Sequence, residues 1–133
     1  MLEDVKIPIR VKLAGLWTSV MFLYIYGDYF ALYKPGVLQS MLAGKMGPLG
    51  PVTQGVMLIP ALMMVVPSLM IVLSLILKAP INRWLNIIVG ILYSLIIVVT
   101  AWGDWRFVEI YGIIEFALTM SLAWLAVKWP KSV

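Results

Sequence analysis

Two carboxylates interrupt long apolar stretches of this chain, Asp28 in the first stretch and Glu115 in the last. Placing an ionised Asp at the centre of a membrane-spanning helix costs about 2.5–3.5 kcal/mol. Acidic residues at such depth are rare, and they commonly mark an ion path, a proton relay or a ligand site. Two carboxylates that lie close together in a medium of low dielectric constant would not both ionise easily. The pair is therefore the leading candidate for a functional site.

Other polar side chains occur near these two carboxylates. Tyr24 precedes Asp28 by four residues, so both occupy one face of a helix. Glu109 and Arg106 lie nearer the start of the last stretch, where the guanidinium can reach a carboxylate. The alternative is structural: Asp28 and Glu115 would bond to tyrosine hydroxyls, to Arg106 or to a neighbouring backbone and lock the helices together. The cost of burying a carboxylate favours the functional interpretation.

The amino acids that are missing exclude several kinds of chemistry. The chain has no cysteine and no histidine. Thiolate and imidazole ligands are therefore absent, and we expect no haem, iron–sulfur or zinc site, while any other cofactor stays unknown. Histidine is also the commonest general base. We assign no catalytic residue and no metal ligand, and we favour a role other than that of an enzyme.

Composition indicates a membrane protein. Hydrophobic residues make up 63% of the chain and charged residues 12%, against about 25% charged residues in soluble domains. So few charges cannot cover the surface of a small soluble domain, and the excess apolar surface must face lipid. The net charge of +4 arises at the ends of the apolar stretches, which favours headgroup contact over nucleic acid. We expect the lipid bilayer as partner, keep a homo-oligomer as an option, and expect no nucleic acid.

Four apolar stretches cover residues 11–33, 55–77, 84–102 and 107–127. About 20 residues of α-helix cross the hydrocarbon core of a bilayer, which matches each stretch. The sequence therefore predicts an all-α, antiparallel bundle of four transmembrane helices that forms a single domain over residues 1–133. Apolar residues at helical spacing between Pro35-Gly36 and Gly47-Pro48 also predict a short interfacial helix in the first outer loop.

Basic residues set the expected orientation. Seven of them lie on the side of the termini and three on the other. The seven are Lys6, Arg10, Lys12, Lys78, Arg83, Lys128 and Lys131, and the three are Lys34, Lys45 and Arg106. By the positive-inside rule we expect a multi-pass protein of the cell inner (plasma) membrane with both termini in the cytoplasm. Asp28 and Glu115 then both fall in the outer half of the membrane. Six tryptophans, Trp17 among them, lie near the ends of the spans, which is typical of an aromatic belt.

Prolines and small residues predict local features of the middle helices. Pro60 and Pro67 are expected to kink the second helix and to free backbone carbonyls, among them that of Met63. Gly90 and Ser94 have the spacing of a close helix–helix contact. All of these roles are structural.

The segment from Lys78 to Arg83 is predicted to be a tight turn before the third helix. Asn82, with Asn86 one turn further on, lies at the start of that helix, and Asn82 is expected to cap it. Arg83 is expected to hold a lipid phosphate or the carboxyl end of the second helix.

Several strings of residues together resemble one prokaryotic family. They are Tyr24-Ile-Tyr26-Gly-Asp28, Asn82-Arg83-Trp84-Leu-Asn86, and Glu115 followed by Trp124 and Lys128-Trp129-Pro130. The family is a domain-of-unknown-function family of small four-span integral membrane proteins, and the resemblance covers nearly the whole chain. It implies the four-span topology and the choice of Asp28 and Glu115, and it implies no activity. In layout the chain is also similar to the DoxX-like membrane proteins, at the level of fold alone.

The leading hypothesis is an integral membrane protein with a carboxylate and tyrosine site open to the outer side. This site would bind or pass a small cation, a proton or a lipophilic amine. One alternative is a membrane enzyme or redox-partner subunit that acts on a lipid-soluble substrate, with the carboxylates as acid and base. Another is a structural accessory subunit without a ligand.

Overall fold

The computed structural model describes residues 1–132, and this part of the chain is all-helical, without a strand. The helices are α1 (Ile9–Ala31), α2 (Val37–Leu42), the 3-10 helix η1 (Gly47–Leu49), α3 (Gln54–Ile76), α4 (Ala79–Ala101) and α5 (Arg106–Val127). Three of them, α3, α4 and α5, are long and apolar enough to cross a membrane. Helix α1 has the same 23-residue length as α3 and α4, but it carries three charges and is not among the three.

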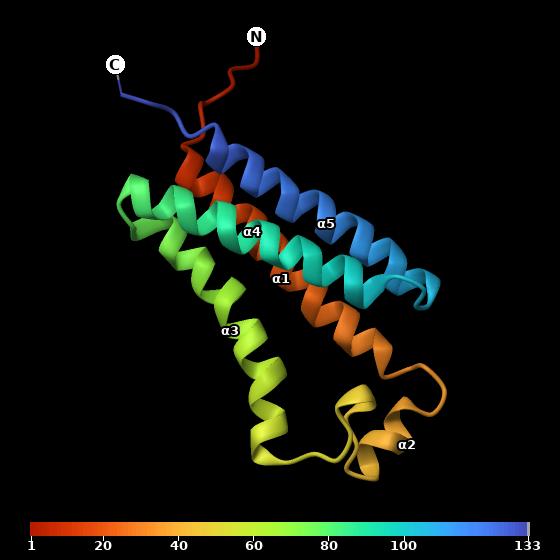
Figure 1. The fold of residues 1–133 in the computed structure, drawn as a ribbon. Coiled ribbons are helices and arrows are strands. Elements are labelled where there is room, and N and C mark those ends of the chain that lie inside the picture. The colour runs from red at the N-terminus through yellow and green to blue at the C-terminus, as the bar shows by residue number, and fades with distance from the viewer. Residues whose placement is uncertain (133) are drawn as a thin grey trace.

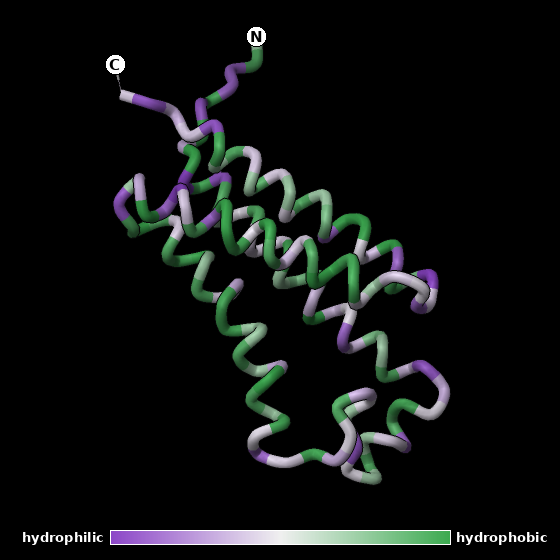
Figure 2. Tube along the Cα trace, viewed as in Figure 1, coloured by the Kyte–Doolittle hydropathy of each residue, from purple (hydrophilic) through white to green (hydrophobic). Residues whose placement is uncertain are grey.

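The four long helices run alternately up and down (Figure 1). Both chain termini and the α3–α4 turn lie at one end, which we call the terminal end. The α4–α5 turn and α2 lie at the opposite, distal end. Helix α1 packs against α3 and α5, and α4 packs along α5, whereas α3 diverges from α4 beyond their turn. Figure 2 shows apolar residues along the long helices and hydrophilic residues mainly at their ends.

The packed core lies in the terminal half of the bundle, where the helices are closest together. Its fully or nearly buried members are Leu13, Trp17, Val20, Met70, Val89, Tyr93 and Leu122. Small residues allow α4 and α5 to approach each other closely along their length. A Cβ atom on Gly90 would lie 2.7 Å from Cδ1 of Leu122, and one on Gly112 would lie 2.6 Å from Cβ of Ala101. The spacing of Gly90 and Ser94 therefore does correspond to a tight contact between α4 and α5.

Helix α4 begins at Ala79 rather than at residue 84, so the predicted turn over residues 78–83 is wrong. Pro80 does not prevent a helix here, because it lies in the first turn of α4, where the missing N–H has no helical partner to lose. Asn82 is consequently inside α4 and does not cap it. Its Nδ2 donates to the carbonyl oxygen of Ser74 at 2.7 Å, so it satisfies the carboxyl end of α3 instead.

A buried chain of hydrogen bonds continues from Asn82 into the core. Asn86 Nδ2 donates to Oδ1 of Asn82 at 2.7 Å, and Asn86 Oδ1 accepts from Nε1 of Trp17 at 2.8 Å. Trp17 is 0% exposed, so it belongs to the core and not to an interfacial belt. The indole N–H needs a partner when buried, and the asparagine provides it.

Two arginines bond to the free carbonyls at the carboxyl ends of helices. Arg83 donates to the carbonyl oxygens of Ala126 at 3.1 Å and Val127 at 3.2 Å, which end α5. Arg10 donates to the carbonyl oxygen of Leu77, just beyond α3. Arg83 therefore holds α5, whereas the sequence suggested a lipid phosphate or the end of α3.

Pro60 and Pro67 both lie inside α3. Because Pro67 has no N–H, it cannot bond to the carbonyl of Met63 one turn earlier. The hydroxyl of Tyr93 on α4 donates to that carbonyl oxygen at 2.5 Å. A side chain from the neighbouring helix thus replaces the hydrogen bond that the proline removes.

Candidate functional site

Asp28 and Glu115 line one cavity of about 310 Å³ between the four long helices. We call it the central cavity. It lies on the distal side of the packed core. Its polar lining comes from every long helix except α3 and from both distal connections: Tyr24, Asp28, Lys34, Tyr93, Thr100, Asp104, Tyr111 and Glu115. Helix α3 contributes Met63 and Met64. The two carboxylates that the sequence singled out are thus brought together, along with Tyr24.

The two carboxylates differ in burial. Glu115 is 9% exposed, whereas Asp28 is exposed. In the part of the chain that the structure describes, neither carboxylate forms an ion pair, and no side-chain hydrogen bond ties it to another helix. Among the described residues, the bonds to tyrosine hydroxyls, to Arg106 or to a neighbouring backbone that the structural alternative expects are thus not formed.

Tyr24 adds a polar atom that lacks a partner. Its hydroxyl oxygen is buried and forms no hydrogen bond with the described residues. Buried hydroxyls almost always have a partner, so an unpaired one marks a place where a further group can bind. Because Tyr24 lies one helical turn before Asp28, its hydroxyl and that carboxylate line the same wall of the cavity.

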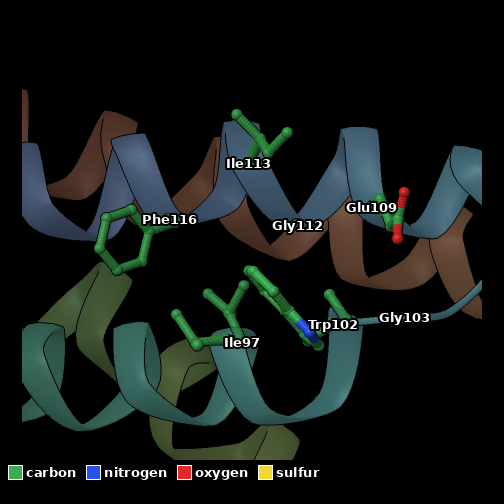
Figure 3. A pocket seen from close by; sticks show the side chains of 9 residues that line it. Ile97, Trp102, Gly103, Glu109, Gly112, Ile113 and Phe116 are labelled. Carbon is green, nitrogen blue, oxygen red and sulfur yellow. The ribbon is translucent and has the colours of Figure 1, made fainter.

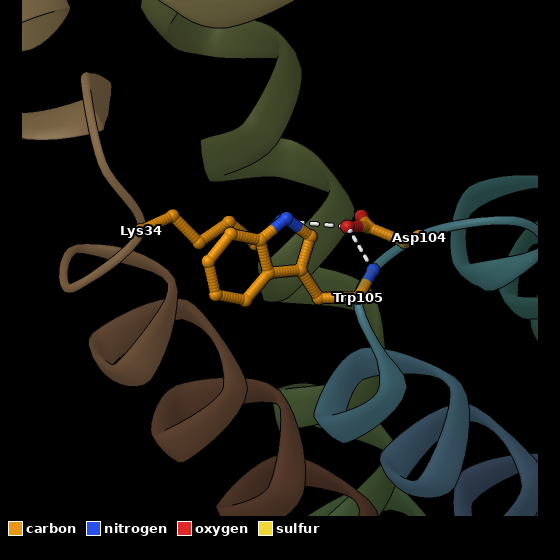
Figure 4. A network of polar contacts seen from close by, with 3 residues as sticks. All are labelled: Lys34, Asp104 and Trp105. Carbon is orange, nitrogen blue, oxygen red and sulfur yellow. Dashed lines mark hydrogen bonds and ion pairs between the residues drawn. The ribbon is translucent and has the colours of Figure 1, made fainter.

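An ion pair lies at the distal end of the central cavity. Lys34 Nζ donates to Oδ1 of Asp104 at 2.7 Å, and the same oxygen accepts the backbone N–H of Trp105 at 2.6 Å (Figure 4). The hydrogen bond from Lys34 lowers the pKa of Asp104 below its usual value. This pair joins the end of α1 to the α4–α5 turn. Sequence reasoning missed it because both residues lie in connections, where helical spacing gives no information about contacts.

Glu109 and Arg106 are not part of the central cavity. Glu109 lines a separate groove of about 580 Å³ between α4 and α5, with Trp102 and Phe116 (Figure 3). It precedes Glu115 by six residues, which places the two side chains about 120° apart around the helix. Arg106 is exposed, and over residues 1–132 the only ion pair is that of Lys34 with Asp104. The expectation that Arg106 reaches a carboxylate is not met.

Within the described residues, no three acidic, histidine or cysteine side chains are grouped as they would be around a metal ion. The chemistry on offer is that of two carboxylates, a free phenol and aromatic rings in a largely apolar chamber. Such groups attract a cation through charge, through hydrogen bonds and through the electron-rich faces of the rings.

Comparison with known proteins gives a family but no activity. No curated protein and no solved structure matches the chain, so the similarity to DoxX-like proteins stays a prediction. A family model described as "Family of unknown function (DUF6326)" matches residues 8–133. Because the match spans nearly the whole sequence, the chain belongs to this family of unknown function, DUF6326.

Proposed function

We propose that the protein crosses the membrane four times and has both termini in the cytoplasm. Helices α3, α4 and α5 are apolar enough to span, and α1 packs lengthwise against α3 and α5. The charges of α1 do not oppose insertion, since Arg10 and Lys12 lie near its terminal end and Asp28 lines the central cavity. The excess of basic residues at the terminal end supports the orientation.

The central cavity is, in this proposal, a binding site for a small cation or a protonated amine on the outer side. The observation that carries it is that Asp28 and Glu115, far apart in sequence, line one chamber without bonding to other side chains. Two uncompensated carboxylates at membrane depth are costly, and a bound cation removes that cost. The free hydroxyl of Tyr24 gives such a ligand one more partner.

Binding is favoured over passage by the packing beneath the cavity. Trp17, Val20, Met70 and Leu122 are at most 2% exposed and fill the terminal half of the bundle. A hydrated ion has no room in such a core, which is packed as densely as an organic crystal. The geometry therefore supports a site that is loaded and emptied from the distal side.

Calorimetric titration with methylammonium in detergent micelles tests this proposal. Glu115→Gln and Asp28→Asn should each weaken binding about tenfold or more, because a charge-assisted hydrogen bond contributes about 1.5–3 kcal/mol. Glu109→Gln is the matched control, since it removes an acid from the same helix but outside the cavity. Equal loss in all three variants, or no binding by the wild type, would reject the cation site.

A further inference from the structure

A second, larger cavity adjoins the central one at the distal end. It measures about 1030 Å³ and lies between the end of α1, the segment that contains α2, and the start of α3. We call it the distal cavity. Most of its walls are apolar, and they include Ile25, Leu32, Val37, Met41, Val52 and Met57. Its polar side chains are Asp28, Tyr29, Ser40 and Lys45, and all of these except Ser40 are exposed.

The two cavities share part of their walls. Asp28 and Ala31 line both of them, so the carboxylate of Asp28 lies where the distal cavity meets the central cavity. In the segment over the distal cavity, α2 has no buried residue. It is flanked by Gly36 and Gly44, which adopt positive φ angles of 87° and 75° that other residues rarely tolerate.

We propose that the natural ligand is an amphiphilic amine. This inference rests on the proposed cation site. The ammonium group lies between Asp28 and Glu115, and the hydrocarbon part extends past Asp28 into the distal cavity. A bare inorganic cation would use only the carboxylates, whereas the hydrocarbon part of an amphiphilic amine would also contact the apolar walls at Val37, Met41 and Met57. A hydrocarbon chain that leaves water for these walls gains about 0.8 kcal/mol for each buried methylene.

A series of short alkylamines distinguishes the contribution of the carboxylates to binding from that of the apolar walls. Methylamine, butylamine and hexylamine, all protonated at pH 7, are titrated into the protein in micelles, with empty micelles as the blank. In the wild type the affinity should rise with chain length, up to about fourfold for each fully buried methylene. Met41→Gln, and Val37→Thr as a second variant, should flatten this rise and leave methylamine binding unchanged.

Leu42→Gln is the matched control for Met41→Gln. Leu42 is the next residue of α2, but it is 81% exposed and does not line the cavity, so its variant should keep the chain-length dependence. The inference is overturned if methylamine and hexylamine bind the wild type equally. It is also overturned if the α2 variants and this control show the same slope. In either case the proposed cation site survives, provided that methylamine binds and Glu115→Gln weakens it. If no amine binds the wild type, both proposals fail.

Discussion

Three acidic side chains in the distal half of the bundle have three different surroundings. Asp104 is paired with Lys34, Glu109 faces an outer groove, and Glu115 is buried in the central cavity without a partner. The helical periodicity of α5 explains why Glu109 and Glu115 have different surroundings, because a separation of six residues places them on different faces of the helix. Glu109 and Glu115 carry the same carboxyl group, and the helix face on which each lies determines its surroundings.

The ion pair of Lys34 and Asp104 should make stability depend on pH in acid. The pKa of folded Asp104 is lowered, whereas the unfolded value is about 3.9. The pair therefore stabilises the fold above that unfolded value, and its contribution is lost as the pH falls through the folded pKa. Thermal unfolding of the wild type and Asp104→Asn should differ at pH 7 and pH 5, by at most about 1 kcal/mol, and converge in stronger acid.

Lys34→Gln provides the control for this pH experiment. It removes the other partner of the ion pair, so the pH dependence of its stability should match that of Asp104→Asn. The double variant should be little less stable than either single variant. A gap between wild type and Asp104→Asn that persists unchanged well below pH 4 would contradict the assignment of the ion pair.

At the scale of elements, the bundle depends on helices that complete one another's backbone hydrogen bonds. Asn82 on α4 bonds to the end of α3, Arg83 on α4 bonds to the end of α5, and Tyr93 bonds to the carbonyl that Pro67 frees. In hydrocarbon an unpaired backbone group is costly, so each of these bonds fixes the position of one helix against another.

The bond from Tyr93 to Met63 can be tested by a double-mutant cycle with Pro67. Tyr93→Phe should destabilise the protein by about 1 kcal/mol, because the carbonyl of Met63 then has no donor. Pro67→Ala restores an N–H at position 67, which can donate to that carbonyl. In the Pro67→Ala background, Tyr93→Phe should therefore lower the free energy of unfolding, measured in mixed micelles, by clearly less than in the wild type. An equal cost in both backgrounds would show that the tyrosine does not compensate for the proline.

The helices and the acidic pair could be predicted from the sequence, and much of what holds them together could not. The bounds of the apolar stretches predicted the positions of α1, α3 and α5 to within a few residues. The number of residues between each carboxylate and the nearer end of its stretch predicted a similar depth for Asp28 and Glu115. Periodicity does not report contacts between connections, so Lys34 and Asp104 were missed. A tryptophan near a span end suggests an interfacial position, yet Trp17 is buried in the core, where Asn86 accepts its N–H.

At the scale of the whole molecule, both termini and the α3–α4 turn lie at one end of the bundle (Figure 1). That end carries most of the basic residues, and the central and distal cavities lie toward the other end. If the terminal end faces the cytoplasm, the site is reached from outside the cell. The orientation in the membrane therefore determines from which side ligands can reach the central cavity.

Cysteine labelling tests this orientation without interference, since the natural sequence has no cysteine. In intact cells, Ser40→Cys should react with a membrane-impermeant thiol reagent because α2 would lie outside. Ser132→Cys should react only after the cells are permeabilised. The reverse pattern would place the carboxylates in the inner half of the membrane.

The central claim is that Asp28 and Glu115 form one site, and infrared difference spectroscopy tests it most directly. Spectra are recorded with and without methylammonium on protein with ¹³C-labelled aspartate, which separates the Asp bands from the Glu bands. In the wild type both sets of bands should change when the amine binds, and at a given amine concentration below saturation the Asp change should be much smaller in Glu115→Gln. An Asp change that is the same in the wild type and in Glu115→Gln, or a change in one set of bands alone, would show that the two carboxylates do not share a ligand.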